Sequence, residues 1–276
     1  MVGRAGRAPR RPAGRPPAPR GRVPPAHRRG AGGAVRAYLA QARVEVVLSL
    51  RQGEQLLVAI GIPLLVLVFF STVDVLPTGS EEPIEVLAPA VLALALMSTA
   101  MVSLGIATGF ERHYGVLERL GLTPLGRARL LAAKLTMVLL VELAQVVVLI
   151  AVAAALGWSP DLEPLAFLAA VLLGTAAFAG LGMLLAGTLS GPANLAATNG
   201  LYLVLLLFGG IAVPADELPA AARDVARLLP SGALAEVLGA AAGNLDWPGP
   251  GAWLVLAAWA CVLPLLAGLL FRWNPR

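Results

Sequence analysis

The chain has 276 residues, of which 58% are hydrophobic and only 13% are charged; its mean hydropathy is +0.80 and its formal net charge is +5. Soluble domains average about 25% charged residues, so this composition excludes an ordinary soluble protein and indicates an integral membrane protein. The single cysteine, Cys261, excludes an intrachain disulfide. The two histidines, far apart and without cysteine partners, give no basis for a metal site.

Residues 1–34 are dominated by Arg, Pro, Ala and Gly, a composition typical of disorder. We interpret them as a disordered basic cytoplasmic tail, either solvated or preceding the true start, in preference to a segment that binds anionic lipid or nucleic acid. In residues 35–52, apolar positions recur with helical spacing and the arginines lie off that face. This pattern predicts a helix in the membrane interface that leads into the first span, although an ordinary extension of that span would have similar residues.

Six apolar windows follow, and a spanning helix needs about 20 apolar residues. The runs are continuously apolar and lack the alternation of a membrane β-barrel. The sequence therefore predicts an all-α integral membrane domain over residues 35–273, with spans near 56–73, 86–109, 135–156, 164–189, 195–213 and 251–271.

The basic residues are distributed unevenly among the segments that connect these spans. Segments 1–55, 110–134 and 272–276 carry 12, 5 and 2 of the 21 basic residues, and a six-span order places all three on one side. Because Lys and Arg near the spans are retained inside, this side is expected to be cytoplasmic. We expect a multi-pass protein of the cell membrane, in contact with its lipids, with both termini in the cytoplasm.

The charged segment 110–134 interrupts two apolar runs. Charged side chains at the bilayer centre cost roughly 2.5 to 3.5 kcal/mol each, so the segment must lie in water or at the headgroups. It predicts a short helix from Glu111 to Leu120 that ends at Gly121, a residue suited to the left-handed position after a helix. Thr123 and Pro124 then suit the cap and first residue of a second helix.

A few polar residues lie within the spans, where they need partners. Glu142 and Gln145 share a helical face; they could line a translocation path or join two protomers, or Glu142 could be neutral or reach headgroup water. Asn194, Thr198 and Asn199 could form interhelical hydrogen bonds or line a substrate path. Small residues in span four favour close helix packing, namely Ala176, Gly180, Gly182 and Ala186.

The segment from Val213 to Leu238 contains two moderately apolar helices separated at Pro230-Ser231-Gly232. Each is too short to span a membrane. By themselves they could form an amphipathic loop that rests on the membrane surface.

The charged segment resembles the cytoplasmic loop of type 2 ABC exporter permeases, which runs Glu-Arg-x-x-Gly-Thr-Leu-Glu-x-Leu, then Thr-Pro and a downstream Lys. The chain matches this pattern at Glu111, Arg112, Gly115, Leu117, Glu118, Leu120, Thr123, Pro124 and Lys134, and has Val116 where Thr is common. The resemblance extends over about residues 35–273, and the compact six-span form is most similar to the daunorubicin-resistance-type branch.

This resemblance implies a non-catalytic membrane subunit that works with a separate ATP-binding cassette ATPase. The chain has no phosphate-binding loop, so ATP and Mg would be bound by the partner and this chain would bind no cofactor. Residues Glu111–Leu120 would form the coupling helix, with Arg112, Glu118 and Arg119 as contact candidates. External re-entrant helices would form an outer gate that includes Gly210, Pro214, Leu218, Pro219, Pro230 and Ser231.

The resemblance further implies a second permease chain, which we expect to give a homodimer, and no nucleic-acid partner. The expected cargo is a hydrophobic small molecule such as a drug or natural product, with polysaccharide or lipid export as the nearest alternative. An ATP-independent carrier that uses Glu142 as a proton relay is a third interpretation. An intramembrane enzyme is the weakest, because the chain shows no nucleophile and base pair or carboxylate cluster.

Overall fold

The computed structural model describes residues 31–73, 83–121, 126–211, 219–243 and 248–272, and every regular element in these ranges is a helix. The prediction of an all-α membrane protein is confirmed. Helix α1 begins at Ala31, so residues 31–34, which the sequence analysis assigns to the tail, are helical instead. The rest of the tail, Thr123, Pro124, Pro214 and Leu218 lie outside the described residues.

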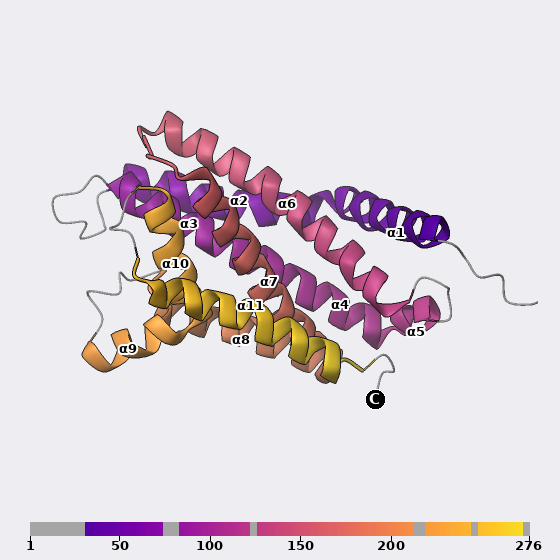
Figure 1. Cartoon of the computed structure of the whole chain (residues 1–276). Helices are drawn as coiled ribbons and strands as arrows, with labels where there is room; N and C mark the ends of the chain where they lie inside the picture. The colour runs from indigo at the N-terminus through magenta and orange to yellow at the C-terminus, as the bar shows by residue number, and fades with distance from the viewer. Residues whose placement is uncertain (1–30, 74–82, 122–125, 212–218, 244–247, 273–276) are drawn as a thin grey trace, which may run out of the picture.

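Figure 1 shows the arrangement of the helices along the chain. In chain order they are α1 (Ala31–Arg51), α2 (Gly53–Thr72), α3 (Pro83–Met97), the π-helix η1 (Ser98–Ser103), α4 (Leu104–His113), α5 (Val116–Gly121), α6 (Arg127–Ala155), α7 (Pro164–Thr188), α8 (Gly191–Phe208), α9 (Ala220–Leu228), α10 (Pro230–Ala241) and α11 (Pro250–Leu270).

Among the described residues, five helical segments are long and apolar enough to cross a membrane: Pro83–His113, which joins α3, η1 and α4, together with α6, α7, α8 and α11. A sixth span is added if α1 and α2, which bend by 63° relative to each other, are taken as a pair. Helices thus lie over all six predicted windows, and the bend separates α2 from the helix expected in the interface.

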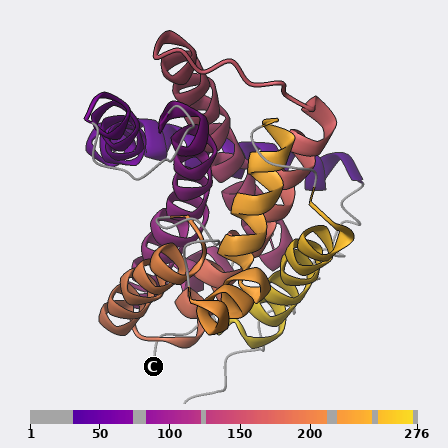
Figure 2. The same ribbon diagram turned by 90° about the vertical axis from the view of Figure 1, so that its left-hand side faces the viewer.

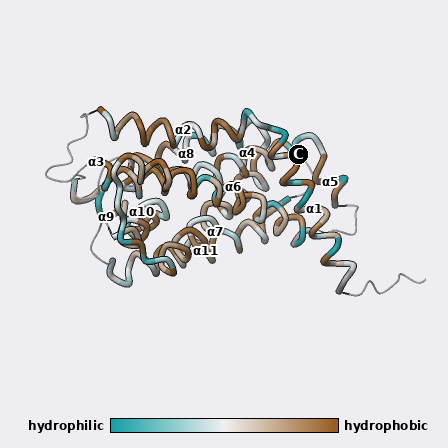
Figure 3. Tube along the Cα trace, turned by 90° about the horizontal axis from the view of Figure 1, so that it is seen from above, coloured by the Kyte–Doolittle hydropathy of each residue, from teal (hydrophilic) through white to brown (hydrophobic). Residues whose placement is uncertain are grey.

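The helical form follows from the solvent, because hydrocarbon offers no partners to backbone N–H and C=O groups and a helix satisfies them internally. Proline lies in the first turn of α7, α8, α10 and α11, where its missing N–H is not needed. Apolar residues dominate the long helices, whereas hydrophilic residues gather around α1 and α5 (Figure 3). We call this end of the bundle, marked by Arg112, Arg119, Lys134 and Arg272, the basic end.

The centre of the bundle is built on close backbone contact between η1, α4 and α7. A Cβ atom on Gly182 of α7 would lie 2.6 Å from the carbonyl oxygen of Met101 in η1, and one on Gly105 of α4 would lie 3.0 Å from the Cα of Gly182. Gly180 makes a similar approach to Pro264 of α11, with a Cβ position 2.5 Å from the proline nitrogen. The predicted close packing of span four is therefore found, and it has specific partners.

Helix α10 lies inside the opposite end of the bundle, where it packs against α3, α7 and α11 (Figure 2). Leu234, Val237 and Leu238 are fully buried, and the carbonyl of Ala241 accepts a hydrogen bond from the backbone N–H of Glu163 at 2.9 Å. Burial of this kind contradicts the alternative in which α10 rests on the membrane surface. The helix is also much shorter than the roughly 20 residues that a span needs, so α10 is buried among the spans without being long enough to cross the membrane itself.

Candidate functional site

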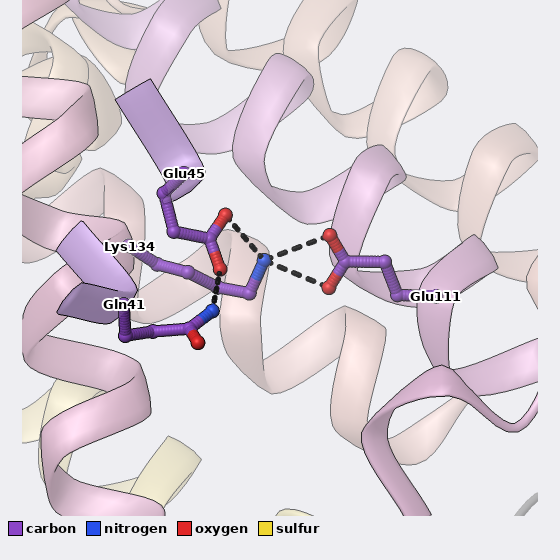
Figure 4. A network of polar contacts seen from close by, with 4 residues as sticks. All are labelled: Gln41, Glu45, Glu111 and Lys134. Carbon is purple, nitrogen blue, oxygen red and sulfur yellow. Dashed lines mark hydrogen bonds and ion pairs between the residues drawn. The ribbon is translucent and has the colours of Figure 1, made fainter. Parts of the chain in front are cut away.

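A buried ion network joins three helices at the basic end (Figure 4). The ammonium group of Lys134, on α6, lies 2.7 Å from Glu111 Oε2 on α4 and 3.3 Å from Glu45 Oε2 on α1. Gln41 donates a hydrogen bond of 2.8 Å from Nε2 to Glu45 Oε1. The Lys134 side chain is only 3% exposed, and those of Glu45 and Glu111 are 9% and 30% exposed. Since a buried charge is costly unless it is paired, these residues fix α1, α4 and α6 relative to one another.

The ion network is flanked by a second polar contact and by a cavity. On one side, the hydroxyl groups of Tyr38 and Thr136 lie 2.6 Å apart and form a second polar link between α1 and α6. On the other side lies a cavity of about 120 Å³ between α1, α2, α4 and α6, whose lining includes Glu45, Glu111 and Lys134. The sequence motif identifies Glu111 and Lys134, but Glu45 carries no motif that would have identified it.

Arg112 faces inward, in contrast to its prediction as an ATPase contact. It is 4% exposed, and its Nη1 donates hydrogen bonds of 2.8 Å to the carbonyl oxygens of Ala186 and Leu189 at the end of α7. The last carbonyls of a helix lack intrahelical partners, so a buried arginine satisfies them well. Arg112 therefore stabilises the junction of α4 and α7 and is not presented to another chain.

The predicted coupling helix is interrupted. Helix α4 continues through Glu111 and Arg112 to His113, and the chain turns at Gly115, whose φ of 71° lies in the left-handed region. Glycine adopts this conformation without steric cost, so the structure has an additional helix stop at Gly115, whereas the predicted stop at Gly121 coincides with the end of α5. The separate helix α5 has only six residues.

Helix α5 has one buried and one exposed side. Leu117 is 1% exposed and packs on Leu130 of α6, and this contact anchors α5 to the helix that carries Lys134. Glu118 and Arg119 are exposed, and sequence reasoning placed them correctly on the surface. It missed Tyr114 and Val116, which are 69% and 41% exposed beside them; their apolar character within a charged loop was the available signal.

The polar residues of span three are buried inside one chain. Glu142 is fully buried and accepts a hydrogen bond of 2.5 Å from the hydroxyl of Thr175 on α7. Gln145 accepts one of 2.9 Å from Thr99 of η1 and donates one of 2.8 Å to the carbonyl of Ala59 on α2. These contacts connect α6 with α2, η1 and α7, so neither side chain is presented for joining two protomers, and Glu142 does not reach headgroup water.

The polar residues of span five divide into two groups. Asn194 and Thr198 are fully buried; Asn194 donates a hydrogen bond of 2.9 Å to the carbonyl of Gly105, and Thr198 donates one of 3.2 Å to Asn194. Asn194 thus forms one of the interhelical hydrogen bonds that the sequence analysis offered as an alternative, and this bond holds α8 against α4. Asn199 is exposed and bonds only within its own helix, to the carbonyl of Leu195 at 2.9 Å.

The described members of the predicted outer gate lie near the ends of α8, α9 and α10. Pro230 and Ser231 are buried at the start of α10, whereas Pro219 is exposed before α9. Gly210 has a φ of 72° just after α8. Within the described ranges, no group of three or more His, Cys, Asp or Glu residues could hold a metal ion.

The fold therefore defines a multi-pass α-helical membrane protein with a charged, ordered end and a short buried helix, α10, at the opposite end. The sequence pattern of the ABC-2 family transporter proteins matches residues 71–271, and the chain belongs to this family. Membership makes the chain a membrane-spanning permease component and implies partnership with an ATP-binding cassette ATPase.

The family match covers residues 71–271 and is made at the level of the whole family. It does not single out the daunorubicin-resistance-type branch. The matched range includes Glu111 and Lys134 but not Glu45, so the α1 partner of the ion network lies outside it. No curated protein matches the chain.

Proposed function

We propose that the chain is the membrane subunit of an exporter, that α5 docks a separate ATPase at the cytoplasmic face, and that ATP and Mg are bound by that partner. The observation that carries the proposal is the connection between α5 and the ion network. Exposed Glu118 and Arg119 lie on a helix anchored by Leu117 to α6, and α6 is in turn fixed to α1 and α4 through Lys134. A displacement of α5 would therefore be transmitted through packed side chains to α6 and, through the ion network, to α1 and α4.

Two such permease chains would form the pathway, as a homodimer in the cell membrane with the basic end in the cytoplasm. The cargo that we favour is a hydrophobic small molecule such as a drug or natural product, as in the daunorubicin-resistance-type branch. Support comes from the compact form with up to six spans. Polysaccharide or lipid export is the competing cargo class.

The double substitution Glu118→Ala and Arg119→Ala is expected to reduce the amount of co-purifying ATPase about tenfold or more, because centrally placed contacts dominate an interface. Both side chains are exposed, so the permease should unfold at the same temperature as wild type. Affinity purification of the tagged chain in mild detergent measures the effect. The matched control is Asp224→Ala, an exposed acidic residue on α9 at the opposite end. Retention of the ATPase by the double variant would refute docking through α5.

Glu142→Gln is expected to leave ATP-driven transport close to the wild-type rate. Glutamine keeps a carbonyl oxygen to accept the Thr175 hydrogen bond and removes only the group that can carry a proton. In an ATP-independent carrier that uses Glu142 as a relay, the same change would abolish transport. Uptake of substrate into inside-out vesicles, with ATP or with a proton gradient alone, distinguishes the two.

A further inference from the structure

An apolar groove of about 260 Å³ lies near the basic end, with α6 on one side and α7 and α11 on the other. Leu131 and Leu135 of α6 form one wall, and Ala179 and Met183 of α7 with Gly268 of α11 form the other. Leu135 and Gly268 are exposed, so the groove opens on the outer surface of the bundle. It shares Leu104 and Lys134 with the polar cavity beside Glu45 and Glu111, which lies between α1, α2, α4 and α6.

The shape and lining of the groove suit a single hydrocarbon chain. Apolar cavities exclude water, and in a spanning bundle the open side of this groove faces lipid. A Cβ atom on Gly268 would have no neighbouring heavy atom within 4 Å, so this wall leaves room for an occupant.

The charge beside the groove indicates which kind of headgroup the bound hydrocarbon chain carries. Phe271 lines the groove, and the next residue, Arg272, is exposed. The backbone N–H of Arg272 donates a hydrogen bond of 3.1 Å to the carbonyl of Gly187, which holds this residue where α7 and α11 end. Lys134 also lines the groove, but its ammonium group is bound by Glu45 and Glu111. Among the described side chains at this groove, Arg272 is therefore the cation available to meet an anionic group.

We propose that this groove binds one acyl chain of an anionic phospholipid, with the lipid phosphate bound by Arg272. Basic residues at the membrane surface attract anionic headgroups, and the adjoining groove supplies the apolar contact that makes the site specific. The bound chain fills the space between α6 and the pair α7 and α11. The inference needs only that the chain is embedded in a membrane, so it can fail or succeed independently of ATPase docking.

The test is a titration of the full-length chain, in mild detergent, with phosphatidylglycerol and with phosphatidylcholine, followed by native mass spectrometry. Wild type is expected to bind one phosphatidylglycerol per chain, about fivefold more tightly than phosphatidylcholine. Gly268→Phe fills the groove and is expected to weaken the binding of both lipids about tenfold or more. Gly251→Phe is the matched control, because Gly251 lies on the same helix, is exposed, has no heavy atom within 4 Å of its Cβ position and does not line the groove.

Arg272→Gln provides a second variant that leaves the groove intact and alters only an exposed side chain. It is expected to reduce phosphatidylglycerol binding to the level of phosphatidylcholine, whose binding stays unchanged. Equal binding by the Gly268→Phe and Gly251→Phe variants, or equal affinity of wild type for the two lipids, would overturn the proposal. A groove covered by a second copy would also overturn it, and would appear as a dimer that is lost in Gly268→Phe and as no bound lipid. If Gly268→Phe does not fold, the Arg272→Gln variant tests the proposal: continued preference for phosphatidylglycerol over phosphatidylcholine would overturn it.

Discussion

Replacing Lys134 with methionine is expected to lower the free energy of unfolding by about 3 to 5 kcal/mol, because removal of one partner leaves buried charge without compensation. The substitution keeps the length and apolar stem of the side chain. It leaves the carboxylates of Glu45 and Glu111 facing the same space without a cation. Thermal or denaturant unfolding of the purified chain in detergent measures the loss.

The control for this substitution is Arg36→Met, which removes an exposed basic residue of α1. Surface charges contribute about 0 to 1 kcal/mol, so Arg36→Met should be nearly neutral. Adding Glu45→Gln and Glu111→Gln to Lys134→Met should restore part of the lost stability, since the repulsion is then gone. Equal effects of Lys134→Met and Arg36→Met would show that the network does not hold the three helices together.

Gly182→Ala is expected to destabilise the bundle by about 1 to 3 kcal/mol, the cost of inserting a methyl group where the surrounding structure is already packed. The new Cβ would lie 2.6 Å from the carbonyl oxygen and 3.1 Å from the Cα of Met101. Both are backbone atoms of η1, so no side chain can move aside. The expected result is a lower unfolding temperature and weaker packing of α7 on η1 and α4.

The same substitution at Gly200 is expected not to destabilise the bundle. Gly200 is exposed on α8 and has no heavy atom within 4 Å of its Cβ position. Alanine is favoured over glycine within a helix by up to about 1 kcal/mol, so Gly200→Ala should be neutral or slightly stabilising. If both variants unfold at the same temperature, the contact between α7 and η1 does not contribute to stability.

The π-helix η1 lies where this close contact meets the buried polar cluster. Thr99 of η1 donates to Gln145, and Met101 of η1 contacts Gly182. A π-helical turn in the middle of a span often marks a functional position. The apolar run of residues 86–109 does not predict this π-helical turn, because the hydropathy of a span is the same whether or not one of its turns contains an extra residue.

Much of the fold could be predicted because the membrane imposes it locally. Apolar runs of sufficient length must be helices when no water is present to bind the backbone, and this physical requirement predicts helices over all six windows from the sequence alone. Helix ends follow from the local sequence only in part: α5 ends at Gly121 as predicted, whereas the additional stop at Gly115 is identified only by its φ of 71°.

The sequence by itself determined the class of protein, the approximate positions of its spans, the surface exposure of Glu118 and Arg119, and the motif that contains Glu111 and Lys134. Tertiary structure alone decided which partners these residues have. Lys134 pairs with Glu45, which lies 89 positions away, and Arg112 binds carbonyls at the end of α7. Partners so distant in sequence leave no local pattern, because their meeting depends on how separate helices pack. That packing determined whether each polar residue of a span faces a neighbouring helix or the surroundings.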